Sequence, residues 1–316
     1  MRNYIVRRLL QVIPIMLGVS VILFFIVHST PGTPFAYLLG PKVDPSIKQK
    51  LMEQMGFNDP LPMQYIRWFK ETITGHLGFS IRSGIPVSTL IHQRLGNTLI
   101  LTSGAFVISL LLAIPIGVLS ATKQYSFVDY AVTSFSFMGI SLPSFFAALL
   151  AIYLFAVKWH IFPMNGITTP GEDFSIGDML YHLILPCITL ALRDIASYSR
   201  FCRSSMLEVM RQDYVRTARS KGLAERVVVY KHALRNGLIP VITLIGFSLP
   251  GLFGGAIIFE TLFTWPGMGL LSFSAVNDRD YPVLMATNLL FAILVIIGNL
   301  VADILYAVVD PRIRYS

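Results

Sequence analysis

The sequence has few charged residues and lacks the common motifs of catalysis. Charged residues make up 13% of the 316 residues, hydrophobic residues make up 54%, and the mean hydropathy is +0.65. A soluble protein of this size needs more charge to cover its surface, so these values predict an integral membrane protein. The sequence contains no G-x-x-x-x-G-K-[ST] phosphate loop, no G-x-S-x-G nucleophile motif and no zinc-like His/Cys spacing. We therefore expect neither catalysis nor a bound cofactor or metal in this chain.

Cysteine is also scarce. The two cysteines, Cys187 and Cys202, have no metal-like spacing and are not placed for a structural disulfide, so we expect two unpaired thiols.

The net charge of +8 would suggest nucleic-acid binding in a soluble protein. Here the basic residues gather in short loops between apolar runs, and the positive-inside rule for membrane proteins explains them better. We expect no nucleic-acid partner.

Six apolar runs are long enough to cross a bilayer, which takes about 20 residues. They lie at residues 9–27, 97–121, 128–157, 179–198, 238–263 and 283–309. The first run is too long for a signal peptide and no small-residue cleavage site follows it. Basic residues concentrate at both termini and after the fourth run, which predicts that both termini are cytoplasmic. The fold class is therefore an all-α polytopic membrane protein with six transmembrane helices in a single domain, 1–316.

Two departures from simple spanning helices are expected. The segment 29–96 forms an extracytoplasmic insertion with short helices at 44–55 and 64–73. The second of these is either an interfacial helix resting on lipid or a small cap that seats an external partner. In the third run, Ser141-Leu142-Pro143 predicts a kink, because proline interrupts the backbone hydrogen bonds of a helix.

The loop at 200–237 concentrates charge between two apolar runs. Within it, Asp213 is suited to cap a short helix, and Gly222 stands where a helix ends in a left-handed residue. One interpretation is that such a loop does no more than fix the membrane topology. A short exposed helix with a sharp exit is also suited to docking in a groove of another protein.

The sequence D-Y-V-R-T-A-R-S-K-G-L at 213–223, followed by H-A-L-R-N-G-L-I-P-V at 232–241, resembles the cytoplasmic coupling loop of ABC importer permeases of the peptide and nickel branch. Further similarities are G-H-L-G-F-S at 75–80, the glycine-rich segment 254–269 with W-P-G-M-G, R-D-Y-P at 279–282 and D-P-R-I at 310–313. His76 replaces an acid that the family often has at this position. The motifs occur in the family's order over nearly the whole chain.

This resemblance implies a permease subunit that moves peptides across the cytoplasmic membrane of a prokaryote by alternating access. Dipeptides, longer peptides and nickel complexes all remain candidates, with peptides favoured. The implied partners are a second homologous permease, two cytoplasmic ABC ATPases that bind ATP and magnesium, an extracytoplasmic solute-binding protein and membrane lipid. The resemblance assigns ATPase coupling to eight residues of the loop: Asp213, Tyr214, Arg216, Ala218, Arg219, Lys221, Gly222 and Leu223.

Ionisable residues inside apolar runs form a second candidate set for a pathway or gate: Arg193, Asp194, Glu260 and Asp303. The adjacent Arg193 and Asp194 serve either a functional role or structural salt bridges near the cytoplasmic face. Glu260 either faces a pathway or caps a helix end. A secondary transporter that uses these acids as a proton relay is the rival function, and a structural membrane scaffold is a third. We also expect the glycines of the fifth run to allow close helix approach. Trp265 suits the belt of aromatic residues at a membrane–water interface.

Overall fold

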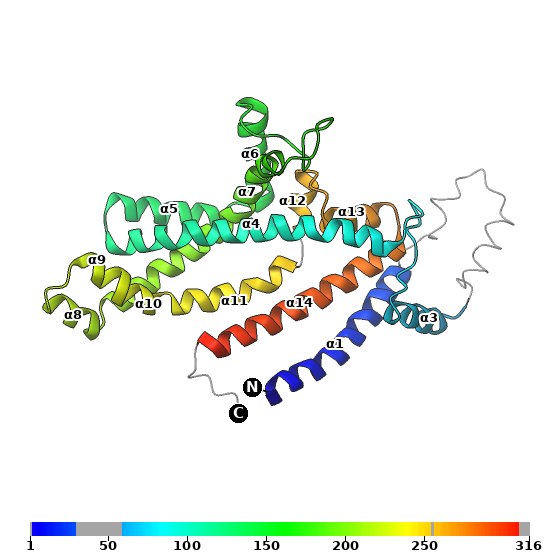
Figure 1. Ribbon diagram of the computed structural model, residues 1–316, viewed down its shortest axis with the longest axis horizontal. Coiled ribbons are helices and arrows are strands. Elements are labelled where there is room, and N and C mark those ends of the chain that lie inside the picture. Colours follow the sequence, from blue (N-terminus) through cyan, green and yellow to red (C-terminus); the bar gives the residue numbers. More distant parts are fainter. Residues whose placement is uncertain (1, 30–58, 254–255, 310–316) are drawn as a thin grey trace. The chain divides into compact units, whose positions relative to one another are not determined.

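The computed structural model describes residues 2–29, 59–253 and 256–309, and these residues confirm the all-α fold class (Figure 1). Within them the only pairing of extended backbone is an isolated antiparallel bridge between Phe79 and Pro86. The predicted helix at 44–55 and the D-P-R-I sequence at 310–313 lie outside the described residues. The chain divides into two compact units, one of residues 1–98 and 266–297 and the other of 99–265 and 298–316. The single-domain assignment for 1–316 stays a prediction.

Unit 1 contains α1 (Arg2–Ser29), α3 (Leu61–Ile73), the start of α4 (Val87–Thr122), α13 (Met268–Asn277) and the first part of α14 (Tyr281–Val309). The predicted helix at 64–73 is confirmed as α3. It packs on α1 through a 2.9 Å hydrogen bond between the hydroxyls of Ser20 and Tyr65 and through aromatic contacts around the buried Phe24. The helix that contains the predicted second span, α4, begins at Val87, ten residues before the predicted start of the span at residue 97, so its first turns lie in the segment assigned to the insertion.

Unit 2 contains the rest of α4 and α14, together with α5 (Phe127–Ser141), α6 (Ser144–Ala151), the π-helical η2 (Ile152–Lys158) and α7 (Ile176–Met210). A run of shorter helices follows: α8 (Asp213–Ser220), α9 (Glu225–Val227), the π-helical η3 (Val228–Ala233), α10 (Leu234–Gly237), α11 (Ile239–Phe253) and α12 (Ile257–Leu262).

Among the residues that the structure describes, four helices, α1, α4, α7 and α14, are each long and apolar enough to span a membrane, and the count reaches six if two bent pairs are each one span. The predicted kink at Ser141-Leu142-Pro143 is confirmed, and the bend between α5 and the α6–η2 segment is 106°. Leu142 is extended and Pro143 begins the next helix without a backbone N–H to donate, so the α-helical ladder stops there. The predicted fifth span is interrupted as well, since α11 ends at Phe253 and α12 starts at Ile257.

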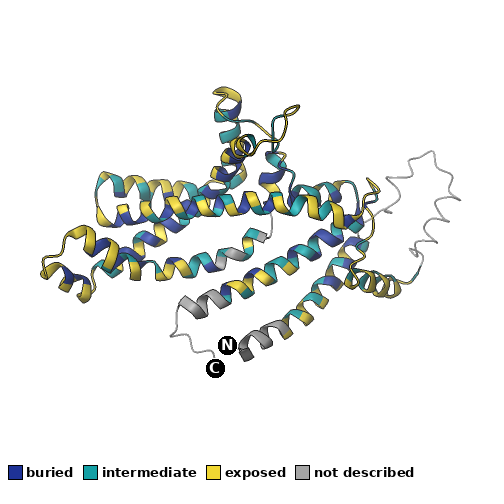
Figure 2. Cartoon of the chain, viewed as in Figure 1, coloured by how far each residue is buried: buried dark blue, intermediate teal, exposed yellow. Residues whose placement is uncertain are grey.

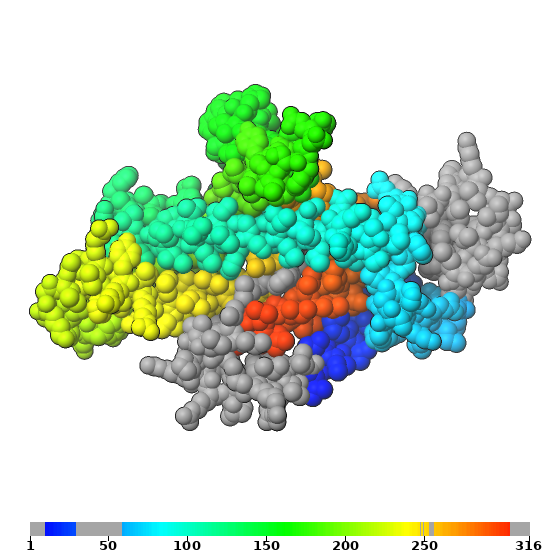
Figure 3. Space-filling view, in the orientation of Figure 1, coloured from blue at the N-terminus to red at the C-terminus, as the bar shows by residue number. Residues whose placement is uncertain are grey.

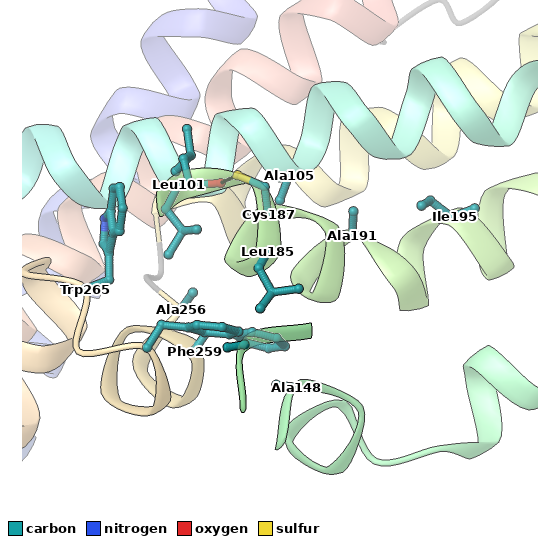
Figure 4. Packing of buried hydrophobic residues seen from close by; sticks show 13 residues of the cluster. Leu101, Ala105, Ala148, Leu185, Cys187, Ala191, Ile195, Ala256, Phe259 and Trp265 are labelled. Carbon is teal, nitrogen blue, oxygen red and sulfur yellow. Dashed lines mark hydrogen bonds between the residues drawn. The ribbon is translucent and has the colours of Figure 1, made fainter. Parts of the chain in front are cut away.

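The main core of unit 2 lies between α4, α6, α7 and α12 (Figure 4). Leu101 and Ala105 of α4 face Cys187 and Ala191 of α7. Helix approach here depends on glycines that the sequence analysis did not single out. A Cβ on Gly117 of α4 would lie 2.6 Å from the Cys202 Cβ and 2.7 Å from the Ser199 carbonyl oxygen, so only glycine fits at this crossing.

Candidate coupling surface

The short helix α8 is built as its sequence predicts, with one correction. Gln212 is the N-cap and Asp213 is the first helical residue, so Asp213 does not cap the helix. Its carboxylate is exposed in the first turn, where it interacts favourably with the positive end of the helix dipole. At the other end, Lys221 is the C-cap and Gly222 has a φ of +75°, which confirms the predicted left-handed exit. The Gly222 N–H donates to the Arg219 carbonyl at 2.9 Å.

One face of α8 is buried in the chain's own core. Val215 and Ala218, three residues apart and so on one side of the helix, join a cluster of buried side chains from α4, α7, η3 and α11. The members of this cluster are Val118, Ala121, Cys202, Met206, Val215, Ala218, Val228, Val229, Ala233 and Val241. The structure therefore places Ala218 against the chain itself. Val215, which the sequence analysis missed, is fully buried and is the main anchor of α8.

The other face of α8 and its exit are exposed (Figure 2). Seven of the eight predicted coupling residues lie on this surface: Asp213, Tyr214, Arg216, Arg219, Lys221, Gly222 and Leu223. In Figure 3 the atoms of α8 and the segment that follows it form an exposed tip of unit 2. We call these seven residues the coupling surface. Its charge is mainly positive, with Leu223 and Tyr214 adding apolar area.

Two contacts hold the coupling surface in shape. The Arg219 guanidinium donates two hydrogen bonds to the Glu225 carboxylate, at 2.8 and 3.2 Å, across the turn that contains Gly222. These bonds hold the pKa of the Glu225 carboxyl below its usual value and raise the pKa of Arg219. The Asn236 amide donates to the Tyr214 hydroxyl at 3.0 Å. The turn and the start of α8 are therefore tied to α9 and α10.

A buried ion pair beside this surface was missed in the sequence. Arg203 of α7 donates from Nε and Nη2 to the two carboxylate oxygens of Asp129 in α5, at 2.6 and 2.8 Å. The Ser120 hydroxyl donates to Oδ1 at 2.5 Å, and the Tyr125 N–H donates to Oδ2 at 2.9 Å. The Asp129 side chain is 3% exposed. A buried carboxylate that accepts four hydrogen bonds joins the α4–α5 turn firmly to α7.

Arg193 and Asp194 point to different sides of α7. Asp194 lines a cavity with residues of α4, α11 and α12, whereas Arg193 lines a small pocket against α5 and α6. They make no ion pair with each other, which follows from the turn of about 100° between adjacent residues of a helix. The structure thus separates the two residues that the sequence places side by side.

The remaining membrane candidates lie elsewhere. Glu260 is fully buried in α12, and its backbone carbonyl accepts from the Trp265 N–H at 2.8 Å; its role in a pathway or as a helix cap stays a prediction. Trp265 is also fully buried, in the core of unit 2, and its place in the interfacial belt stays a prediction. Asp303 lies in α14 and is partly exposed.

In unit 1, two of the sequence motifs meet. Asp280 of R-D-Y-P is buried and accepts hydrogen bonds from the Ser80 hydroxyl, at 2.5 Å, and from the Ile81 N–H, at 3.1 Å. Arg82 pairs with Asp278 in the same place. The end of G-H-L-G-F-S is therefore held against the start of α14. His76 is an exposed residue whose ring lies 3.0 Å from the Thr74 hydroxyl.

Neither cysteine forms a disulfide, as predicted, and both are buried. Among the residues that the structure describes, no group of three or more His, Cys, Asp or Glu side chains comes together as a metal site would require.

Comparison with known proteins identifies the family. The profile of the binding-protein-dependent transport system inner membrane component matches residues 113–315, and the profile of the N-terminal part of the same membrane component matches residues 1–102. The chain belongs to this permease family. The match to 113–315 contains the coupling surface, the Asp129–Arg203 pair and Asp194.

Curated relatives of this permease match over the full length of both chains. It is 46% identical over 316 residues to the oligopeptide transport system permease protein AppB of Bacillus subtilis. It is 39% identical over 333 residues to the dipeptide transport system permease protein DppB of Alkalihalophilus pseudofirmus, and 37% identical over 338 residues to DppB of Escherichia coli. The permease is therefore a multi-pass membrane protein of an ABC transport system.

Proposed function

We propose that this chain is the permease subunit of an ABC importer that moves di- or oligopeptides across the cytoplasmic membrane of a prokaryote. The observation that carries the proposal is the construction of α8, with a buried face fixed to the chain's own core and an exposed basic face open to a partner. The full-length similarity to oligopeptide and dipeptide permeases supports peptides as the cargo.

In this proposal two partner ATPases bind ATP and Mg²⁺, and the permease contributes no ATPase site. Each ATPase would offer a groove of negative and apolar character to a coupling helix, complementary to the Arg216, Arg219 and Leu223 surface. Closure of the ATPases then moves α8 as a rigid element, because Val215 and Ala218 fix it to α4, α7 and η3. The Asp129–Arg203 pair passes the motion on to α5. These helices move together between inward-open and outward-open states.

The proposed assembly also contains a second homologous permease and an extracytoplasmic solute-binding protein. From the distribution of basic residues, we propose that both termini and the loop 200–237 lie in the cytoplasm. The segment 29–96 then lies on the outer side of the membrane. Exposed apolar side chains on α1, among them Leu10, Ile13 and Ile22, suit contact with membrane lipid.

Affinity isolation of the tagged chain from its native membrane in mild detergent tests the proposal. We expect a second polytopic permease and P-loop ATPases to co-purify, and the reconstituted complex to take up peptide only with ATP and loaded binding protein. The rival secondary transporter predicts recovery of the chain alone, with uptake that a protonophore abolishes and that needs no ATP. That second result would overturn the proposal.

A further inference from the structure

Unit 2 contains a cavity of about 670 Å³ with a single charged residue in its wall. The wall comes from α4, α7, α11 and α12, with Thr102, Asp194 and Ser248 as its hydroxyl and carboxylate groups. The other residues that line it are apolar, for example Phe106, so the carboxylate faces a mainly hydrophobic space. Cavities of roughly 300–1,000 Å³ with mostly apolar walls and a few polar groups are typical of small-ligand sites.

Asp194 has no hydrogen-bond donor and no ion-pair partner within the part of the chain that the structure describes. Arg193, its neighbour, lines the separate pocket against α5 and α6. By contrast, Asp129, a buried acid of α5 that contacts α7, accepts hydrogen bonds from Arg203, Ser120 and the Tyr125 backbone. An ionisable residue inside a predicted membrane span that faces a cavity and makes no hydrogen bond or ion pair there indicates a functional site, because burial of a charge without such a partner is costly.

We propose that Asp194 binds the protonated amino terminus of the cargo peptide while the peptide passes through the permease. This inference rests on the proposed peptide-import function. A free peptide always carries an ammonium group at its amino end, whatever its side chains, so one carboxylate serves cargoes of different sequence. Thr102 of α4 and Ser248 of α11 also line the cavity; their hydroxyls donate to the backbone carbonyls of Leu99 and Leu244, and in this proposal their oxygens accept hydrogen bonds from peptide N–H groups. The Ser248 hydroxyl is itself oriented by the Tyr198 hydroxyl, which donates to it at 2.6 Å.

In this proposal Asp194 contacts the peptide inside the permease, after the binding protein has released it. Because one charge-assisted hydrogen bond in a partly open cavity gives modest affinity, the peptide can enter and leave again within a transport cycle. Asp194 therefore contributes selectivity for a free amino terminus after the binding protein has released its cargo. A lysine side chain of the peptide offers the same ammonium chemistry, and the experiment separates these two sources.

The experiment uses the complete reconstituted transporter and measures ATP-driven uptake per loaded binding protein, with the loaded fraction determined beforehand by equilibrium dialysis. Three cargoes are compared: a peptide with neutral side chains and a free amino terminus, its N-acetylated form, and an N-acetylated peptide that contains lysine. We expect the wild type to carry the free-amino peptide about tenfold faster than either acetylated peptide.

The variants decide what causes this preference. Asp194→Asn should lower uptake of the free-amino peptide about tenfold and leave uptake of the acetylated peptides unchanged, so that the preference disappears. Asp194→Glu, which keeps the charge, should restore the preference. Glu208→Gln removes an exposed acid from the same helix and should retain the wild-type preference.

Four results would overturn the assignment. The first is equal wild-type uptake rates for free and acetylated peptides, and the second is an equal fold-loss of both uptake rates with Asp194→Asn. The third is a preference for the free amino terminus that survives in that variant. The fourth is fast uptake of the acetylated peptide that contains lysine, which would show that the site binds side chains. The wild-type comparison decides the matter even if the asparagine variant does not assemble. A wild-type complex that hydrolyses ATP but carries none of the three cargoes would instead refute the proposed peptide-import function.

Discussion

Removing the Asp129 carboxylate should destabilise the permease by about 3 kcal/mol. Breaking a buried ion pair by removing one partner costs about 3–5 kcal/mol, because the remaining charge is left buried and uncompensated. Here the Asp129 side chain is 3% exposed and the Arg203 side chain is 24% exposed. Some water reaches the guanidinium, so we expect the lower end of that range for Asp129→Ala.

The assay is reversible unfolding of the purified permease in mixed micelles titrated with sodium dodecyl sulfate. A double-mutant cycle with Asp129→Ala and Arg203→Met isolates the pair from other consequences of each substitution. We expect a coupling free energy of about 2 kcal/mol or more, since the two residues share two hydrogen bonds and the double variant leaves no charge unpaired. Asp173→Asn, which neutralises an exposed acid in the loop before α7, should change stability by about 0.5 kcal/mol or less.

A coupling free energy below about 0.5 kcal/mol would refute this reasoning, because it would show that the hydrogen bonds are not formed in the protein. The same variants test the transmission of motion. If Asp129 links α5 to α7, then Asp129→Ala should lower the number of peptides transported per ATP hydrolysed, in addition to lowering stability.

Three further substitutions test other contacts. Gly117→Ala should destabilise the protein by about 1–3 kcal/mol, because its Cβ overlaps the Ser199 carbonyl, whereas Gly96→Ala in the same helix meets open space and should be neutral or slightly stabilising in the same unfolding assay. Gly222→Pro should abolish ATP-coupled uptake while membrane insertion is retained, since proline cannot adopt a φ of +75°; normal uptake would contradict the role of this turn. Asp280→Asn should release the loop it anchors and raise amide hydrogen exchange in residues 80–84 by about tenfold or more, and unchanged exchange would show that the carboxylate does not hold the loop.

The elements that could be predicted are those set by local sequence. Spans rich in apolar residues, the break before Pro143 and the end of α8 at Gly222 each depend on a few neighbouring residues. The helix α3 was also found, from its amphipathic pattern of Tyr65, Trp68 and Phe69. The 106° angle at the break was not predictable, because proline stops the helix whereas packing against α7 and α12 sets its direction.

The contacts between distant residues were not predictable. Asp129 and Arg203 lie 74 residues apart, and no periodicity connects them. The local signal was the Ser126-x-x-Asp129 spacing at a helix start, which does form a cap, since the Asp129 N–H donates to the Ser126 hydroxyl. That signal explains the start of α5 but not the buried carboxylate. The burial of Trp265 in the core of unit 2 likewise depends on contacts with distant residues, which no local pattern gives.

Site-specific photocross-linking tests most directly whether the surface of α8 binds a partner ATPase. A benzophenone amino acid at Leu223, which is exposed on the coupling surface, is compared with the same group at Phe174, which is exposed in the loop before α7. In native membranes we predict a covalent adduct with a P-loop ATPase from position 223 and none from position 174. An intact, transporting complex that gives no ATPase adduct from position 223, or an ATPase adduct from position 174, would contradict the account.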